Sequence, residues 1–146
     1  MDWKTYAIDH LKDYDIKKTG VQLLDEQIKT LEMEFTSIRS AKTDGDPVRG
    51  SNGNRREDML LTNIALRDEL KENREITMRK IDIVEKGLSA LTREERRILE
   101  LFFICRPYNY VSRLCDELNV EQSELYRRKN RALKRFTMAY CGVVEL

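Results

Sequence analysis

The side chains with the most concentrated chemistry lie near the carboxyl end of the chain. Between Leu125 and Val144 there are six basic residues and no acidic one: Arg127, Arg128, Lys129, Arg131, Lys134 and Arg135. Guanidinium and ammonium groups bind phosphate oxygens, and arginine also forms paired hydrogen bonds with guanine. A run of charges often only solvates a helix face, but the segments 56–90 and 92–105 mix both signs and this one does not. The pattern favours contact with DNA.

The other residues with catalytic or metal-binding chemistry are scattered. His10 is the only histidine, and the three cysteines, Cys105, Cys115 and Cys141, form no C-x-x-C pair. A metal centre or an activated nucleophile needs several such groups together. We therefore expect no enzyme, no metal and no cofactor. His10 is expected at the boundary of its helix, and the cysteines are expected to act as small apolar side chains.

Residues 43–54 (TDGDPVRGSNGN) hold three of the six glycines and one of the two prolines. This composition predicts a loop. A phosphate-binding P-loop would need Gly-Lys-Ser/Thr between a strand and a helix, and the segment lacks it.

Two long helices are predicted on either side of that loop, at residues 3–41 and 56–91. In the first, a heptad pattern of three- and four-residue spacings runs through Val21, Leu24, Ile28, Leu31, Phe35 and Ile38, and Trp3, Ala7, Leu11 and Tyr14 extend it towards the N-terminus. In the second, Leu60, Ile64, Leu66 and Leu70 come first, and Ile81, Val84, Leu88 and Leu91 follow after the polar stretch KENREITMRK. That polar stretch argues against continuous pairing along the helix. Narrow apolar stripes pack against other helices, so we expect an antiparallel hairpin or a coiled coil with a second chain.

The last third predicts a helix-turn-helix. Thr92 and Glu95 fit a capping box, and the helix that follows should end at Arg106 and Pro107. An amphipathic stretch at 111–118 leads to Asn119, a residue type that tolerates the positive φ of a tight turn. A final helix at 121–140 should bury Leu125, Ala132, Leu133 and Phe136 and present its basic residues outward. Such a helix fits the major groove of DNA.

This region also resembles region 4 of bacterial sigma factors. The matching residues are Leu91, Glu95, Arg96, Leu118, Asn119, Val120, Leu125, Ala132, Leu133 and Phe136. With the long helices and the loop before it, the whole chain is similar to phage-encoded late transcriptional regulators of the RinA and ArpU type. The resemblance implies binding to double-stranded promoter or regulatory DNA in a bacterial host cell, and contact with RNA polymerase.

The resemblance places the base-reading positions on Gln122, Ser123, Tyr126 and Arg127, where sigma factors usually carry Arg, Glu, Arg and Gln. We therefore expect a target other than the standard −35 element. Gln122 suits adenine and Arg127 suits guanine, whereas Ser123 and Tyr126 can bond to bases or phosphate. The candidates for phosphate or protein contact are Arg128, Arg131, Lys134 and Arg135.

Composition and charge agree with an all-α protein. Charged residues make up 36% and hydrophobic residues 40% of the 146, which favours long solvated helices over barrels and sandwiches. Residues 1–90 hold 16 basic and 18 acidic side chains, net −2, and residues 91–141 hold 11 and 7, net +4. We expect a helical hairpin or coiled coil at 1–90 and a DNA-binding domain at 91–141. With no signal-like or membrane-spanning apolar run, we expect a cytoplasmic protein.

A single recognition helix buries little surface on DNA, so the N-terminal helices are also interpreted as a means of forming a homodimer. Two other classes stay open: an assembly protein like the DNA-recognising small subunit of a phage packaging machine, and a coiled-coil adaptor of RNA polymerase that does not bind DNA.

Overall fold

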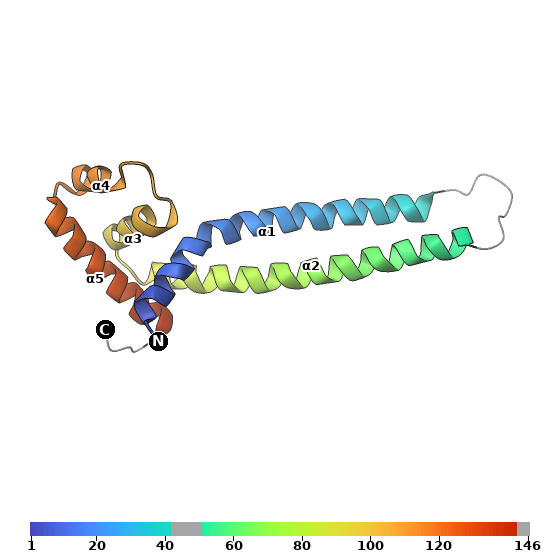
Figure 1. Cartoon of the computed structure of the whole chain (residues 1–146), viewed down its shortest axis with the longest axis horizontal. Coiled ribbons are helices and arrows are strands. Elements are labelled where there is room, and N and C mark those ends of the chain that lie inside the picture. Colours follow the sequence, from blue (N-terminus) through green and yellow to red (C-terminus); the bar gives the residue numbers. More distant parts are fainter. Residues whose placement is uncertain (42–50, 143–146) are drawn as a thin grey trace. The chain divides into compact units, whose positions relative to one another are not determined.

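Two long helices form the N-terminal two-thirds of the chain, as predicted. The computed structural model describes residues 1–41 and 51–142, with side chains from Asn54 on in the second range, and these residues contain helices and no strands. Helix α1 spans Trp3–Ser40 and helix α2 spans Ser51–Ser89 (Figure 1). The all-α prediction is confirmed.

The predicted loop at 43–54 is only partly described. Residues 43–50 of it lie outside the described residues, and residues 51–54 already belong to α2. The predicted start near Arg56 is therefore wrong by several residues. The segment 51–54 contains one glycine, which costs a helix about 1 kcal/mol relative to alanine. The strongly helical sequence that follows in α2 can outweigh this cost.

Residues Thr19–Met78 form one compact unit, here called the hairpin unit. Within it the two helices run antiparallel side by side (Figure 1). The helix α1 contributes the predicted apolar seam, with Val21 and Ile28 buried. The helix α2 faces it with positions that also repeat every three or four residues, namely Arg56, Leu60, Asn63, Arg67, Leu70, Arg74 and Thr77. This half-polar seam was not predicted, and Ile64 and Leu66 are exposed instead of facing α1.

Polar contacts replace apolar packing along that seam. The Asn63 side chain donates from Nδ2 to the Leu31 carbonyl oxygen at 2.9 Å. The Arg67 guanidinium lies 4.8 Å from the centre of the Phe35 ring. Within KENREITMRK, Lys71 and Arg74 form ion pairs with Glu32 and Asp25 of α1. The polar stretch therefore does not interrupt the pairing of the helices.

The second compact unit, here called the head unit, combines residues 1–18 with the chain from Arg79 onward. It is larger than the predicted 91–141 domain because the first turns of α1 and the last turns of α2 share its core. The buried residues of that core are Ala7, Leu11, Tyr14, Val84, Leu88, Leu99, Ala132, Leu133 and Phe136.

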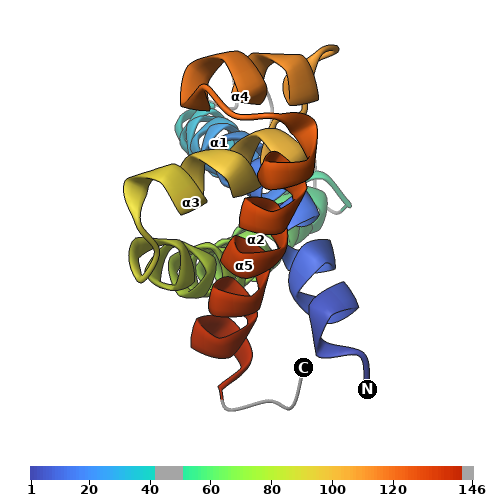
Figure 2. The same ribbon diagram turned by 90° about the vertical axis from the view of Figure 1, so that its left-hand side faces the viewer.

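The rest of the head unit follows the predicted order. After α2 come α3 (Arg93–Leu99), the π-helix η1 (Glu100–Ile104), α4 (Tyr110–Leu118) and α5 (Gln122–Cys141) (Figure 2). Thr92 caps α3 by accepting a hydrogen bond from the Glu95 backbone N–H at 3.2 Å, as predicted. The Glu95 carboxylate is used differently, since it accepts from Arg135 of α5 at 2.7 Å. The π-turn was not predicted.

Candidate nucleic-acid interface

The turn between α4 and α5 depends on Asn119. Its φ of 54° and ψ of 50° are left-handed, as the sequence predicted. The Val120 backbone N–H donates to the Cys115 carbonyl oxygen at 3.1 Å, which closes the turn. Because Glu121 returns to an extended conformation at the N-cap, α5 starts in a new direction after only three residues.

A small core holds α4 and α5 against α3 and η1. The buried residues of this core are Ile98, Leu101, Phe102, Leu114 and Leu125. Leu125 is fully buried, so the first turns of α5 are fixed on one side by apolar packing. Between α3 and α4, Arg97 donates two hydrogen bonds to the Glu117 carboxylate, at 3.1 and 2.9 Å. Those bonds lower the pKa of Glu117 and help to fix the angle of α4.

The side of α5 that faces away from Leu125 is uncovered within the head unit. Gln122, Ser123, Tyr126 and Arg127, the four predicted base-reading residues, are all exposed, and the Arg127 side chain is 79% exposed. Ser123 and Arg127 line one face with Asn130 and Lys134, at spacings of three or four residues. Gln122 and Tyr126, four residues apart, form the neighbouring row, so the four predicted base-reading residues lie on adjoining rows of the free side of the helix.

Two of the four predicted phosphate-binding residues are engaged inside the head unit. The Arg128 guanidinium pairs with Glu94 of α3 and with Glu124 of α5, and these bonds raise the pKa of Arg128. Arg135 pairs with Glu95 at 2.7 Å, and the Glu95 side chain is 14% exposed. Both arginines therefore tie α5 to the start of α3. The sequence could not show this, because the carboxylates lie on another helix.

The other two phosphate candidates remain available. Arg131 and Lys134 are exposed, and neither forms an ion pair with any residue that the structure describes. Arg127 has one contact of this kind, 3.7 Å from a Glu124 carboxylate oxygen. This contact is long and lies at the surface, so it constrains the guanidinium little.

An aromatic cluster with two cations flanks the first turns of α5, which the sequence did not reveal. The Phe102 ring has its centre 5.1 Å from that of Tyr110 and 5.8 Å from that of Tyr126, edge to face in both pairs. The Lys129 ammonium lies 5.4 Å from the Tyr126 ring centre, and the Arg106 guanidinium lies 4.2 Å from that of Tyr110. Burial lowers the pKa of Lys129. The sequence interpretation treated Arg106 only as a helix end and Lys129 only as part of the basic run.

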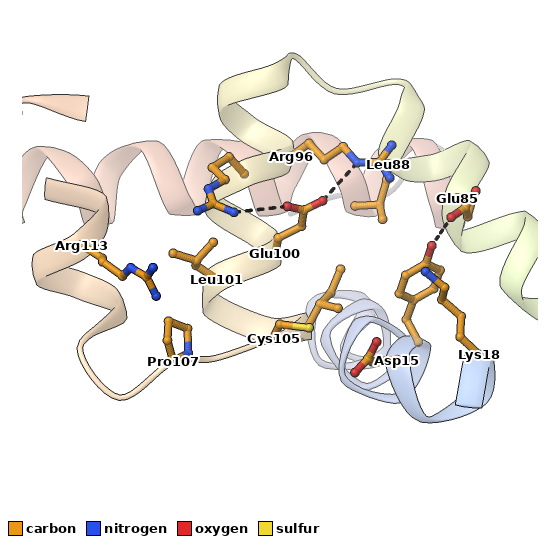
Figure 3. A pocket seen from close by; sticks show the side chains of 13 residues that line it. Asp15, Lys18, Glu85, Leu88, Arg96, Glu100, Leu101, Cys105, Pro107 and Arg113 are labelled. Atoms are coloured by element: carbon orange, nitrogen blue, oxygen red, sulfur yellow. Dashed lines mark hydrogen bonds and ion pairs between the residues drawn. The ribbon is translucent and has the colours of Figure 1, made fainter. Parts of the chain in front are cut away.

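A pocket of about 560 Å³ lies elsewhere in the head unit, where α1, α2, α3 and η1 meet (Figure 3). The Tyr14 hydroxyl donates to Glu85, and burial together with this bond raises the pKa of Tyr14. Glu100 lies 3.4 Å from Arg96 and 3.9 Å from Arg97. Since these groups neutralise one another, we interpret them as contacts that hold the helices together.

The scattered reactive residues have separate surroundings. The His10 ring lies between Tyr6 and Tyr140, with ring centres 4.4 and 5.4 Å away, and burial lowers its pKa. Cys105 is exposed, contrary to the expectation of apolar packing, because it follows the last turn of η1. Although the residue is exposed, partial desolvation of its sulfur and the nearby Asp15 carboxylate raise the pKa of this thiol. Among the residues described, no three His, Cys, Asp or Glu side chains are grouped so as to hold a metal ion.

In the part of the chain that the structure describes, no helix combines the length and the apolar character needed to cross a bilayer.

Comparison with known proteins places the chain in a family. No curated protein and no solved structure matches it. A family model described as a protein of unknown function, DUF1492, matches residues 37–137. That range includes all of α2, α3, η1 and α4 and most of α5, and it covers more than half of the sequence. The chain therefore belongs to the DUF1492 family.

Proposed function

We propose that the protein is a transcription regulator that binds specific sequences in double-stranded DNA through α4 and α5. One observation carries the proposal: the four residues predicted to read bases share the uncovered face of a helix whose other side is fixed by buried Leu125 and by ion pairs to α3. An α-helix fits the major groove, and the second helix of a helix-turn-helix enters it with its N-terminal residues at the base edges.

The proposed roles follow from side-chain chemistry and exposure. Gln122 pairs with adenine and Arg127 with guanine, each through two hydrogen bonds. Ser123 and Tyr126 bond to bases or to phosphate. Tyr126 keeps a defined orientation because its ring packs against Phe102.

Phosphate contacts are assigned to cations whose charge is not balanced by a carboxylate of the described residues. Arg131 and Lys134 lie next to the base-reading residues on α5, and Lys129 and Arg106 lie beside Tyr126 and Tyr110. Arg128 and Arg135 are removed from this set, since their charge is already balanced by glutamates of α3. Phosphate contacts of this kind set the position of the helix, whereas the base contacts set the sequence.

The proposal includes partners. Specific binding by one small module is weak, so the regulator is proposed to act as a homodimer. The sigma-like resemblance adds RNA polymerase as a second protein partner, and the bacterial cytoplasm is the compartment in which both would be met.

Salt dependence of DNA binding tests the proposal. A fluorescein-labelled random duplex is titrated with the full chain at a series of salt concentrations, and anisotropy is recorded. With two to four phosphate contacts for each head unit, log K should fall with log salt at a slope of about −2 to −4 for one head unit and about twice that for the dimer. Absence of binding at low salt, or an affinity that salt does not change, would contradict DNA binding.

A further inference from the structure

The first turns of α1 pack against α5 within the head unit (Figure 2). Ala7 and Leu11 are fully buried, in the same core as Phe136 of α5. This packing brings the start of the chain to the helix that carries the proposed base-reading residues. Polar side chains at the edges of the contact between α1 and α5 therefore lie close to the proposed DNA-binding surface.

The two edges of this contact carry different side chains. At one edge, the rings of Tyr6 and His10 approach that of Tyr140, near the C-terminal end of α5, with centres 6.2 and 5.4 Å away. Successive residues of a helix turn by about 100°, so Lys4 projects from the side of α1 opposite to Tyr6, with the buried face between them. Lys4 therefore lies at the other edge, towards the N-terminal half of α5, which holds Lys129.

Lys129 lies at the border of the aromatic cluster, next to a proposed base-reading residue. Its ammonium is 5.4 Å from the Tyr126 ring centre and 5.7 Å from that of Phe102. Burial of Lys129 and the positive charge of Lys4 both lower the pKa of Lys129, which agrees with the placement of Lys4 at this edge. Two like charges within reach of each other repel, and an anion that binds to both relieves the repulsion.

The charges of these two lysines are available to another molecule. Neither ammonium forms an ion pair with any residue that the structure describes. The acidic residue nearest to Lys4 in the sequence is Asp2, whose carboxylate accepts from the Thr5 hydroxyl at 2.6 Å and from the Lys4 backbone N–H at 3.1 Å. Asp2 is therefore used at the start of α1, and the exposed Lys4 side chain is left for an anion from outside.

A phosphate of DNA is the anion that this position favours. Because the Tyr126 ring adjoins Lys129, a duplex that receives Tyr126 in its major groove brings a sugar-phosphate strand along this side of α5. Each strand carries one negative charge per about 3.4 Å of helix axis, so two separate lysines can meet neighbouring phosphates. Lysine binds phosphate as a point charge on a flexible stem, and such a contact does not require a rigid site.

We propose that the first turn of α1 belongs to the DNA-binding surface, where Lys4 and Lys129 contact neighbouring phosphates of the strand that passes beside Tyr126. The inference rests on the proposed function and adds Lys4, which lies outside the helix-turn-helix and outside the basic run of the sequence. In this arrangement the packing of α1 on α5 has a role in binding, because it positions Lys4 beside the recognition helix.

The salt dependence of variants that lack one of these charges tests the contact. With the full chain and a labelled random duplex, Lys4→Ala and Lys129→Ala should each make the slope of log K against log salt shallower by about 0.9 for each bound head unit, and the double variant by about twice as much. Lys4→Arg keeps the charge and should keep the wild-type slope. The matched control is Lys17→Ala, which should leave the slope unchanged because Lys17 follows His10 by two helical turns and lies on that edge of α1.

The possible results are distinct. Shallower slopes for Lys4→Ala and Lys129→Ala, with the helicity of the wild type by circular dichroism and equal losses on all duplex sequences, support the contact. If Lys129→Ala fails to fold because Lys129 is partly buried, the exposed Lys4 decides the question alone.

A wild-type slope for Lys4→Ala, or an equal change with Lys17→Ala, would overturn the contact and leave DNA binding by α5 standing. Such a result would favour an acidic protein as the partner of these lysines. A wild-type chain that binds no duplex at low salt would instead refute the proposed function and this contact together.

Discussion

Neighbouring arginines of α5 have different surroundings, and their expected roles differ accordingly. Arg127 projects from the uncovered side of the helix, whereas Arg128 turns towards Glu94 and Glu124. The sequence alone treats the two as equal members of a basic run. The difference depends on carboxylates of α3, which only the fold brings near.

Removing Arg127 should impair discrimination between sequences. Arg127→Ala is expected to cost about 1–3 kcal/mol on the specific site and to relax the preference at one base pair, since the proposed paired contact to guanine would be lost. Competition titrations with duplexes that differ at single base pairs measure this effect. Equal losses on specific and random duplexes would remove Arg127 from the base-reading residues.

Removing phosphate contacts should weaken binding to all sequences alike. The double variant Arg131→Ala and Lys134→Ala is expected to make the salt slope shallower by about 2 for each bound head unit, because each neutralised phosphate contributes about 0.9. Arg128→Ala is the control, since its internal ion pairs predict a lower midpoint of thermal unfolding with little change in the slope. If Arg128→Ala changed the slope as much as the double variant does, the assignment of free and engaged cations would be wrong.

At the level of the elements, the sequence predicted most of what local chemistry determines. The long helices, the Thr92 cap and the left-handed Asn119 are confirmed because each depends on propensity or on residues close in sequence. The π-turn of η1 and the bond from Arg135 to Glu95 were missed, since both depend on how distant helices pack.

The seam of α2 was missed for a different physical reason. A search for apolar residues selected Ile64 and Leu66, but the phase of the helix places Asn63, Arg67 and Arg74 towards α1. Their contacts to Leu31, Phe35 and Asp25 are polar or cation–π, which a hydrophobic pattern does not detect. Mixed seams of this kind need the fold to reveal them.

Two glycines in the long helices should respond in opposite ways to the same substitution. A Cβ on Gly87 would lie 2.9 Å from Cε2 of the buried Phe136 ring, whereas a Cβ on Gly20 would meet no atom within 4 Å. Gly87→Ala should therefore destabilise the protein by about 1–3 kcal/mol through overpacking. Gly20→Ala should stabilise it by about 0.5–1 kcal/mol through helix propensity. Denaturant unfolding of the full chain measures both, and a stabilising Gly87→Ala would contradict the close packing of α2 on α5.

For the whole molecule, the net charge of +1 conceals how the charges are used. Within the head unit, Arg97, Arg128 and Arg135 are each paired with a glutamate, so fewer cations are free than the basic run in the sequence suggests. The predicted domain boundary near residue 90 also came from composition alone. The change in composition marks where the helix-turn-helix begins and not where its core ends. That core includes Ala7, Leu11 and Val84.

Selection of bound duplexes from a random library with the full chain, followed by sequencing, is the most direct test of the proposed role of α5. The structure predicts one enriched motif, bound at least about 1,000-fold more tightly than scrambled duplex, with relaxed positions when Gln122 or Arg127 is replaced by alanine. A pool that stays unenriched after several rounds, or a motif that neither substitution changes, would contradict the entry of this helix into the major groove.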